Sequence, residues 1–289
     1  MMDSRTPQVL RQPNAGNGWA ALSPRTMIAS VLTHWRLILR MARRELEGRF
    51  KGSRLGILWV ILQPLLMLAV YTFAFGVVLQ ARWGQEETGS PWEYALFLFT
   101  GLLIFNVFAE VVGRAPTLML ENTSYIKNMV FPTEILPIVT LLVGLFNFVI
   151  GFVVLMVLYV LQRGVPPVTT FLVWLPLVPL CLFTMGLAWF LSALGVYLRD
   201  LKQLVAILIP TLMFLSPLFY PVSVLPETVR PAIMLNPLAA IIESMRDLVF
   251  FGRLPDMPMY LAGVIASAVI AWLGFIWFVK TRRGFADVV

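Results

Sequence analysis

Of the 289 residues in this chain, 59% are hydrophobic and only 13% are charged. A soluble domain of this length needs more polar surface, so lipid is the expected solvent for most of its helices. The net charge of +7 comes from basic residues in short segments beside apolar runs, which indicates membrane topology and anionic lipid rather than nucleic acid. With Cys181 and His34 as the only residues of their kinds, a disulfide framework and a cysteine-based metal cluster are excluded.

The N-terminal segment is polar and is followed by an amphipathic helix. Residues 1–30 are rich in Asn, Gly, Gln and Pro and contain no apolar signal-peptide core, so we expect a disordered cytoplasmic tail ahead of one membrane domain over residues 31–289. In residues 34–52, apolar side chains recur every three or four positions from Trp35 to Leu46, with arginines on the other face. This pattern predicts a helix that lies in the membrane interface.

Six apolar runs approach the roughly 20 residues that a helix needs to cross a bilayer. They are 56–79, 94–112, 135–161, 168–197, 203–220 and 260–279. The fold class is therefore an all-α polytopic membrane protein with six spans. Between the last two runs, residues 221–259 are too polar to span and too long for a simple loop, and their periodicity over 237–251 predicts short helices at the outer surface.

Basic residues set the orientation. If the side of residues 36–54 is cytoplasmic, the inner segments hold fourteen Lys and Arg residues and the outer segments five. This distribution satisfies the positive-inside rule and places both termini in the cytoplasm.

Motifs for catalysis are missing. The sequence contains no phosphate-binding loop, no metalloprotease motif and no nucleophile elbow, so enzymatic chemistry within this chain is not expected. Within the spans, Glu110 is the clearest charge. It suits a substrate or proton site, but Arg114 follows four residues later on the same helical face, and we favour an ion pair between these two side chains.

A polar stretch, Glu121–Thr133, separates the second and third runs on the inner side. Ser124 is suited to capping a short helix that ends before Pro132. Such a helix fits docking to another protein, and the alternative is a surface turn.

Several segments together resemble a known family. The most specific is Arg49-Phe-Lys-Gly-Ser-Arg-Leu-Gly56 with Trp59 and Gln63-Pro64 after it; 122–132, 197–201, Asn236-Pro237 and 284–287 match as well. From Val31 to the C-terminus the chain resembles the permease subunit of polysaccharide-exporting ABC transporters, the O-antigen exporters in particular.

This resemblance implies a homodimer in the bacterial inner membrane, bound to two copies of a separate ATPase. ATP and Mg would bind that partner, and no cofactor is expected on this chain. The substrate would be a polysaccharide on undecaprenyl pyrophosphate, moved from cytoplasm to periplasm. The resemblance also assigns three groups of residues. The ATPase-coupling helix would hold Ser124, Tyr125, Ile126, Lys127, Asn128, Met129 and Phe131; the interface helix would hold Trp35, Arg43, Arg44 and Glu45; the periplasmic gate region, 221–259, would hold Asn236, Pro237, Glu243 and Arg246.

Three basic residues lie where the interface helix turns into the first span. Arg49, Lys51 and Arg54 are expected at headgroup level, where guanidinium forks bind phosphate oxygens well. We predict that they receive the substrate pyrophosphate. The alternative is that they serve topology and anionic lipid only.

Other functions share parts of this pattern. Capsule and teichoic-acid exporters are similar, so the sequence leaves the glycan open. An ABC exporter of small molecules shares the six-span plan, although such relatives commonly carry a large outer domain or a fused ATPase. A membrane glycolipid transferase would need paired carboxylates or a metal cluster at one face, and the inner acidic residues here are scattered beside Arg and Lys.

Overall fold

The computed structural model describes residues 23–288 except for 52–54, 57, 79–90 and 127–130. Within the described residues the chain is helical and contains no strand. The principal helices are α1 (Pro24–Thr33), α2 (Trp35–Phe50), α3 (Leu58–Tyr71), α4 (Pro91–Glu121), α6 (Leu136–Arg163), α7 (Trp174–Tyr197), α8 (Leu201–Leu215), α10 (Pro237–Arg246) and α11 (Met257–Thr281). The short helical segments are η2 (Thr72–Val78), α5 (Thr123–Ile126), η3 (Thr133–Ile135), η4 (Val168–Leu172), η5 (Val222–Val224), α9 (Arg230–Met234), η6 (Asp247–Phe251), η7 (Arg282–Gly284) and α12 (Phe285–Val288).

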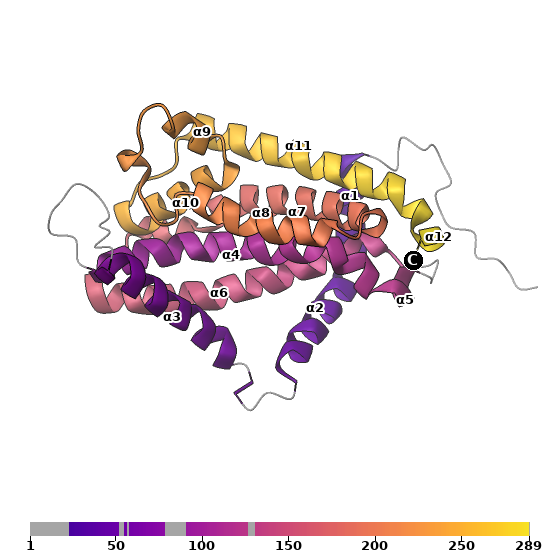
Figure 1. The fold of residues 1–289 in the computed structure, drawn as a ribbon, viewed down its shortest axis with the longest axis horizontal. Coiled ribbons are helices and arrows are strands. Elements are labelled where there is room, and N and C mark those ends of the chain that lie inside the picture. The colour runs from indigo at the N-terminus through magenta and orange to yellow at the C-terminus, as the bar shows by residue number, and fades with distance from the viewer. Residues whose placement is uncertain (1–22, 52–54, 57, 79–90, 127–130, 289) are drawn as a thin grey trace, which may run out of the picture.

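The long helices α4, α6, α7 and α11 run side by side along the long axis, with α4 packed against α6, α7, α8 and α10 (Figure 1). The end that holds α5, α12 and the C-terminus is called the basal end here, and the end that holds α9 and α10 the distal end. Helices α2 and α3 form the two arms of a V whose wide end lies at the bundle and whose narrow end points away from it (Figure 1).

Five helical segments are long and apolar enough to cross a membrane among the described residues: Leu58–Val78, Trp92–Glu121, Thr133–Arg163, Val168–Tyr197 and Met257–Thr281. These confirm a polytopic all-α membrane protein. The fifth predicted span, 203–220, corresponds to α8. It returns the chain toward the distal end, but its 15 residues measure only about 22 Å against a hydrocarbon core of roughly 30 Å. The count of six full spans is therefore not confirmed.

Close helix packing depends on glycine at a few positions. A Cβ on Gly274 of α11 would lie 2.1 Å from the carbonyl oxygen of Gly186 on α7, and a Cβ on Gly195 would lie 2.1 Å from that of Pro116 on α4. Small residues at these crossings let the backbones approach as they do in membrane helix pairs.

At the N-terminus a helix begins inside the predicted tail. The Ser23 hydroxyl accepts a hydrogen bond from the Thr26 amide (3.3 Å), and Pro24 occupies the first helical position, which is a favourable helix start. The expectation of disorder through residue 30 is therefore wrong for residues 24–30, and residues 1–22 lie outside the described part.

Both terminal segments meet at one carboxylate near the basal end. Glu134 of η3 accepts a hydrogen bond from Ser30 of α1 (3.1 Å) and pairs with Arg282 of η7 (2.8 Å). Its carbonyl oxygen also accepts from the Trp189 indole of α7 (3.0 Å). The N-terminal helix and the C-terminal segment consequently lie at the same end of the bundle.

Candidate functional site beside the first membrane span

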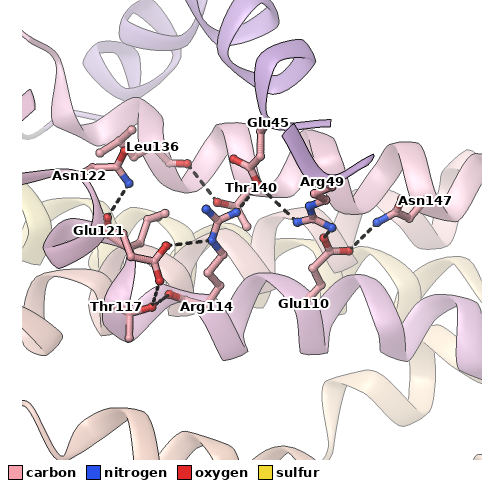
Figure 2. A network of polar contacts seen from close by, with 11 residues as sticks. Glu45, Arg49, Glu110, Arg114, Thr117, Glu121, Asn122, Leu136, Thr140 and Asn147 are labelled. Carbon is pink, nitrogen blue, oxygen red and sulfur yellow. Dashed lines mark hydrogen bonds and ion pairs between the residues drawn. The ribbon is translucent and has the colours of Figure 1, made fainter. Parts of the chain in front are cut away.

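A chain of charged side chains joins the predicted interface helix to the centre of the bundle. Helix α2 presents Ile38 and Ala42 as buried residues toward α6, and this packing places the C-terminal half of α2 next to α4. The Arg49 guanidinium lies 2.5 Å from a Glu110 carboxylate oxygen on α4 and 3.3 Å from a Glu45 oxygen on its own helix. On the other side of Glu110, the Asn147 amide of α6 donates to its second oxygen (2.9 Å), as Figure 2 shows.

The predicted pair between Glu110 and Arg114 is wrong. Arg114 instead binds Glu45 and, at 3.3 Å, Glu121. Glu110 and Arg114 of α4 thus each pair with a residue of α2 (Figure 2). The ion pairs connect two helices and do not run along α4. The sequence spacing did identify the face correctly, but the position of α2 decides the pairing.

The network continues to the start of the predicted coupling segment. The Thr117 hydroxyl donates to Glu121 (2.6 Å), which is the last residue of α4, and α5 begins two residues later. Oxygen Oε1 of Glu45 receives both Arg49 and Arg114. The polar chain therefore runs without a break from Asn147 at mid-bundle to Glu121 at the basal end of α4.

A cavity of about 740 Å³ opens between α3, α4 and α6 beside this network. Its polar lining consists of Arg49, Gln63, Asn106, Glu110 and Asn147, and its aromatic lining includes Trp59, Tyr71, Phe99 and Phe148. A cavity of this size and mixed lining is in the range of ligand sites.

The predicted pyrophosphate residues are separated by the structure. Arg49 lines the cavity and belongs to the network, whereas Lys51 is exposed just after α2 ends. Arg54 lies outside the described residues. Of the interface-helix residues, Trp35 is 43% exposed, Arg43 and Arg44 are exposed, and only Glu45 joins the network.

The coupling segment is described in part. Its helix α5 covers Thr123–Ile126, and the Tyr125 and Phe131 rings stack at 4.6 Å between centroids; Lys127, Asn128 and Met129 lie outside the described residues. Ser124 stands within the helix, so it does not cap the helix as predicted, because Asn122 occupies the position before its first residue. The Asn122 amide donates back to the carbonyl of Leu118 (2.9 Å).

At the distal end the predicted gate region folds into η5, α9, α10 and η6, as expected for short helices. Asn236 begins α10 by accepting from the Leu238 amide (3.0 Å) and donates to Ser216 (2.8 Å), and Pro237 follows as the first helical residue. The buried Arg246 pairs with Glu243 (2.9 Å). Burial lowers the pKa of Arg246 to about 10, against the raising effect of Glu243, and burial raises the pKa of Glu243. Arg246 therefore keeps its charge at neutral pH.

Comparison with known proteins decides the family. Residues 36–250, which are most of the chain, match the sequence model of the ABC-2 type transporter family. The chain belongs to the ABC-2 type transporter family. Among its relatives, the O-antigen export system permease protein RfbA of Myxococcus xanthus is 30% identical over 257 residues, 88% of this chain and 95% of that protein. RfbA of Klebsiella pneumoniae is 28% identical over 258 residues with the same coverage. The polysialic acid transport protein KpsM of Escherichia coli is 25% identical over 218 residues, 74% of this chain and 81% of that protein.

Membership of the ABC-2 family confirms the resemblance and makes this chain the membrane component of a transporter rather than a catalytic enzyme. The sequence analysis of this ABC-2 protein did not identify two polar residues that line the cavity, Asn106 and Asn147. Each is an amide near the middle of an apolar run, and Asn106 stands one helical turn before Glu110. A search for uncharged polar residues in phase with the single in-span carboxylate would have found Asn106.

Proposed function

We propose that this chain is the channel-forming permease of an ATP-driven exporter that moves lipid-linked polysaccharide from cytoplasm to periplasm across the bacterial inner membrane. The observation that carries the proposal is the similarity to RfbA export permeases over nearly the whole of both chains. The basic residues at the basal end support the orientation with both termini in the cytoplasm.

A homodimer is proposed because one membrane-spanning segment has little cover in a single chain. In the most apolar part of the span Leu58–Val78, which comprises α3 and η2, only 11% of the residues are buried. The corresponding share in the span of α4 is 83%. Helix α8 is likewise exposed along most of its length. A second copy that packs on α3 and α8 would enclose a path lined by both chains, as the family resemblance implies.

The ATPase is proposed to dock at the basal end through the coupling segment 121–132. Helix α5 and the stacked Tyr125 and Phe131 rings follow α4 at the basal end, and Glu121 connects this segment to the charged network. ATP and Mg would bind the ATPase, and this chain would transmit the resulting movement.

At the mouth of the cavity, Arg49 is proposed to bind the substrate pyrophosphate together with Lys51 and Arg54. The Arg49 guanidinium already holds two carboxylates, and a phosphate presents the same oxygen geometry to an arginine fork. A second candidate substrate, a capsule glycan, is favoured by the similarity to KpsM and uses the same site.

The test is ATP hydrolysis by this chain purified with the ATPase encoded beside it. Residues 124–131 are replaced by a flexible linker of equal length, and a matched control replaces residues 164–167 at the distal end in the same way. Stable co-purification, with hydrolysis that loses its stimulation by lipid-linked glycan only in the first variant, is expected. If no ATPase associates, or if lipid-linked glycan does not stimulate hydrolysis by the unmodified complex, the proposed function is wrong. If both variants behave like the unmodified complex, the coupling role of residues 121–132 is wrong.

A further inference from the structure

Helix α4 has one exposed residue in the middle of its span. From Tyr94 to Val112, a fully described stretch, every side chain is buried or partly buried except Asn106. Asn106 lines the cavity between α3, α4 and α6, and Gln63 of α3 is an exposed side chain in the same lining. Two amides thus face an open volume at membrane depth.

Neither side-chain amide has a hydrogen-bond partner among the described residues. In the same cavity, by contrast, the Asn147 side-chain amide donates to Glu110 (2.9 Å). Polar groups without a partner in a membrane-spanning region are costly, and they are retained where they face water or a polar ligand. The cavity therefore offers exposed polar groups to a ligand within a lining that is otherwise largely apolar and aromatic.

The side chains that line the cavity indicate which kind of ligand it can bind. At the mouth, the two positive side chains Arg49 and Arg114 are paired with the two negative side chains Glu45 and Glu110, and the uncharged polar groups of the interior are amides. Amides donate to and accept from hydroxyl groups. Trp59 and Tyr71 add aromatic surface on the α3 side, and flat aromatic rings pack against the C–H faces of sugar rings. Neutral sugars carry both features, whereas inorganic ions and lipid tails lack one or both.

We propose that this cavity is a binding site for the neutral sugar residues next to the phosphate of the exported glycolipid, and that Asn106 and Gln63 bind their hydroxyl groups. The proposal rests on the proposed function and assigns the glycan, as distinct from the pyrophosphate, to side chains of α3 and α4. Since the phosphate is proposed to lie at Arg49, the adjoining sugars enter the part of the cavity lined by the amides.

The experiment measures binding of undecaprenyl-linked glycan, extracted from cells that carry the transporter, to this chain reconstituted with its ATPase in phosphatidylethanolamine and phosphatidylglycerol nanodiscs. Asn106→Leu and Gln63→Leu remove the amides, and Asn106→Gln retains one. Gln162→Leu is the matched control, because Gln162 is an exposed amide at the distal end of α6 outside the cavity. Thermal unfolding establishes that each variant is folded.

Loss of one well-placed hydrogen bond corresponds to roughly tenfold weaker binding. We expect that loss for each Leu variant, a smaller loss for Asn106→Gln and none for Gln162→Leu. Binding of undecaprenyl pyrophosphate without sugars should be unchanged in every variant. If the folded Leu variants bind the glycolipid as tightly as the unmodified complex, the cavity assignment is wrong while the export function stands. If the unmodified complex binds neither glycolipid nor ATPase, the export function fails, and the cavity assignment with it.

Discussion

Replacing Arg246 with Met should cost more stability than any other single loss of charge in the distal region. The side chain is 1% exposed and donates to the carbonyl oxygens of Phe97 (3.2 Å), Pro217 (2.6 Å) and Leu218 (3.1 Å). It therefore joins α4, the end of α8 and α10. Gly101 permits this approach, because a Cβ there would lie 2.9 Å from the Arg246 guanidinium.

The magnitude follows from what the substitution leaves behind. Three buried carbonyl groups lose a charged donor, and breaking a buried ionic network by removing one member costs about 3–5 kcal/mol. For a chain of this size the loss corresponds to a decrease of roughly 10 °C in Tm. Glu243→Gln should cost only about 1 kcal/mol, because the glutamine oxygen can still accept from Arg246 and the guanidinium keeps its three carbonyl acceptors.

The assay is thermal unfolding of the purified chain in detergent, followed by tryptophan fluorescence. Arg253→Met is the matched control, since Arg253 is exposed and its guanidinium lies over the Phe251 ring, 5.6 Å from the centroid; its expected effect is below about 0.5 kcal/mol. An Arg246→Met protein with the Tm of the unmodified chain would refute the reasoning, and so would equal losses for Arg246→Met and Glu243→Gln.

Three further perturbations test the packing and the charged network. Gly274→Ala should destabilise the chain by about 1–3 kcal/mol through overpacking against α7, whereas Gly263→Ala on the same helix meets no atom within 4 Å and should cost nothing in the same unfolding assay. Glu134→Gln should increase amide hydrogen exchange in both terminal segments, because one carboxylate holds them; unchanged exchange would contradict that role. Glu45→Gln and Arg114→Gln should be non-additive by about 1 kcal/mol in a double-mutant cycle, and additive losses would show that the contact contributes nothing.

Local sequence signals predicted most elements of this fold. Apolar runs located the spans, because the thickness of the bilayer sets the length of a helix that crosses it. The spacing of apolar residues by three or four positions from Trp35 onward located α2. The run 203–220 is longer than α8 because it counts apolar residues past the end of that helix at Leu215, where Ser216 and Pro217 follow. Composition does not reveal where a helix ends inside an apolar segment, because proline and serine also occur within membrane helices.

The partners of polar side chains were less predictable. The spacing of Glu110 and Arg114 is correct for a pair along one helix, yet both bind residues of α2, which lies more than 60 positions earlier in the chain. The same limit applies to Arg246, whose three backbone partners come from two distant elements. Helical periodicity gives the face of a side chain, and the neighbour on that face depends on tertiary packing.

The way Glu45 is shared explains how the cavity and the coupling segment can act on each other. Arg49 and Arg114 both bind oxygen Oε1 of Glu45, so a stronger hold of one guanidinium on that oxygen weakens the other. An anion that takes Glu110's place at Arg49 would change this balance, and Arg114 carries the change to Glu121, two residues before α5 begins. A contiguous network couples two sites only where it has two alternative arrangements, and the proposed binding of phosphate at Arg49 would supply the second one. On the proposed function, Glu45 is thus the residue at which anion binding at Arg49 and the predicted coupling segment should become energetically linked.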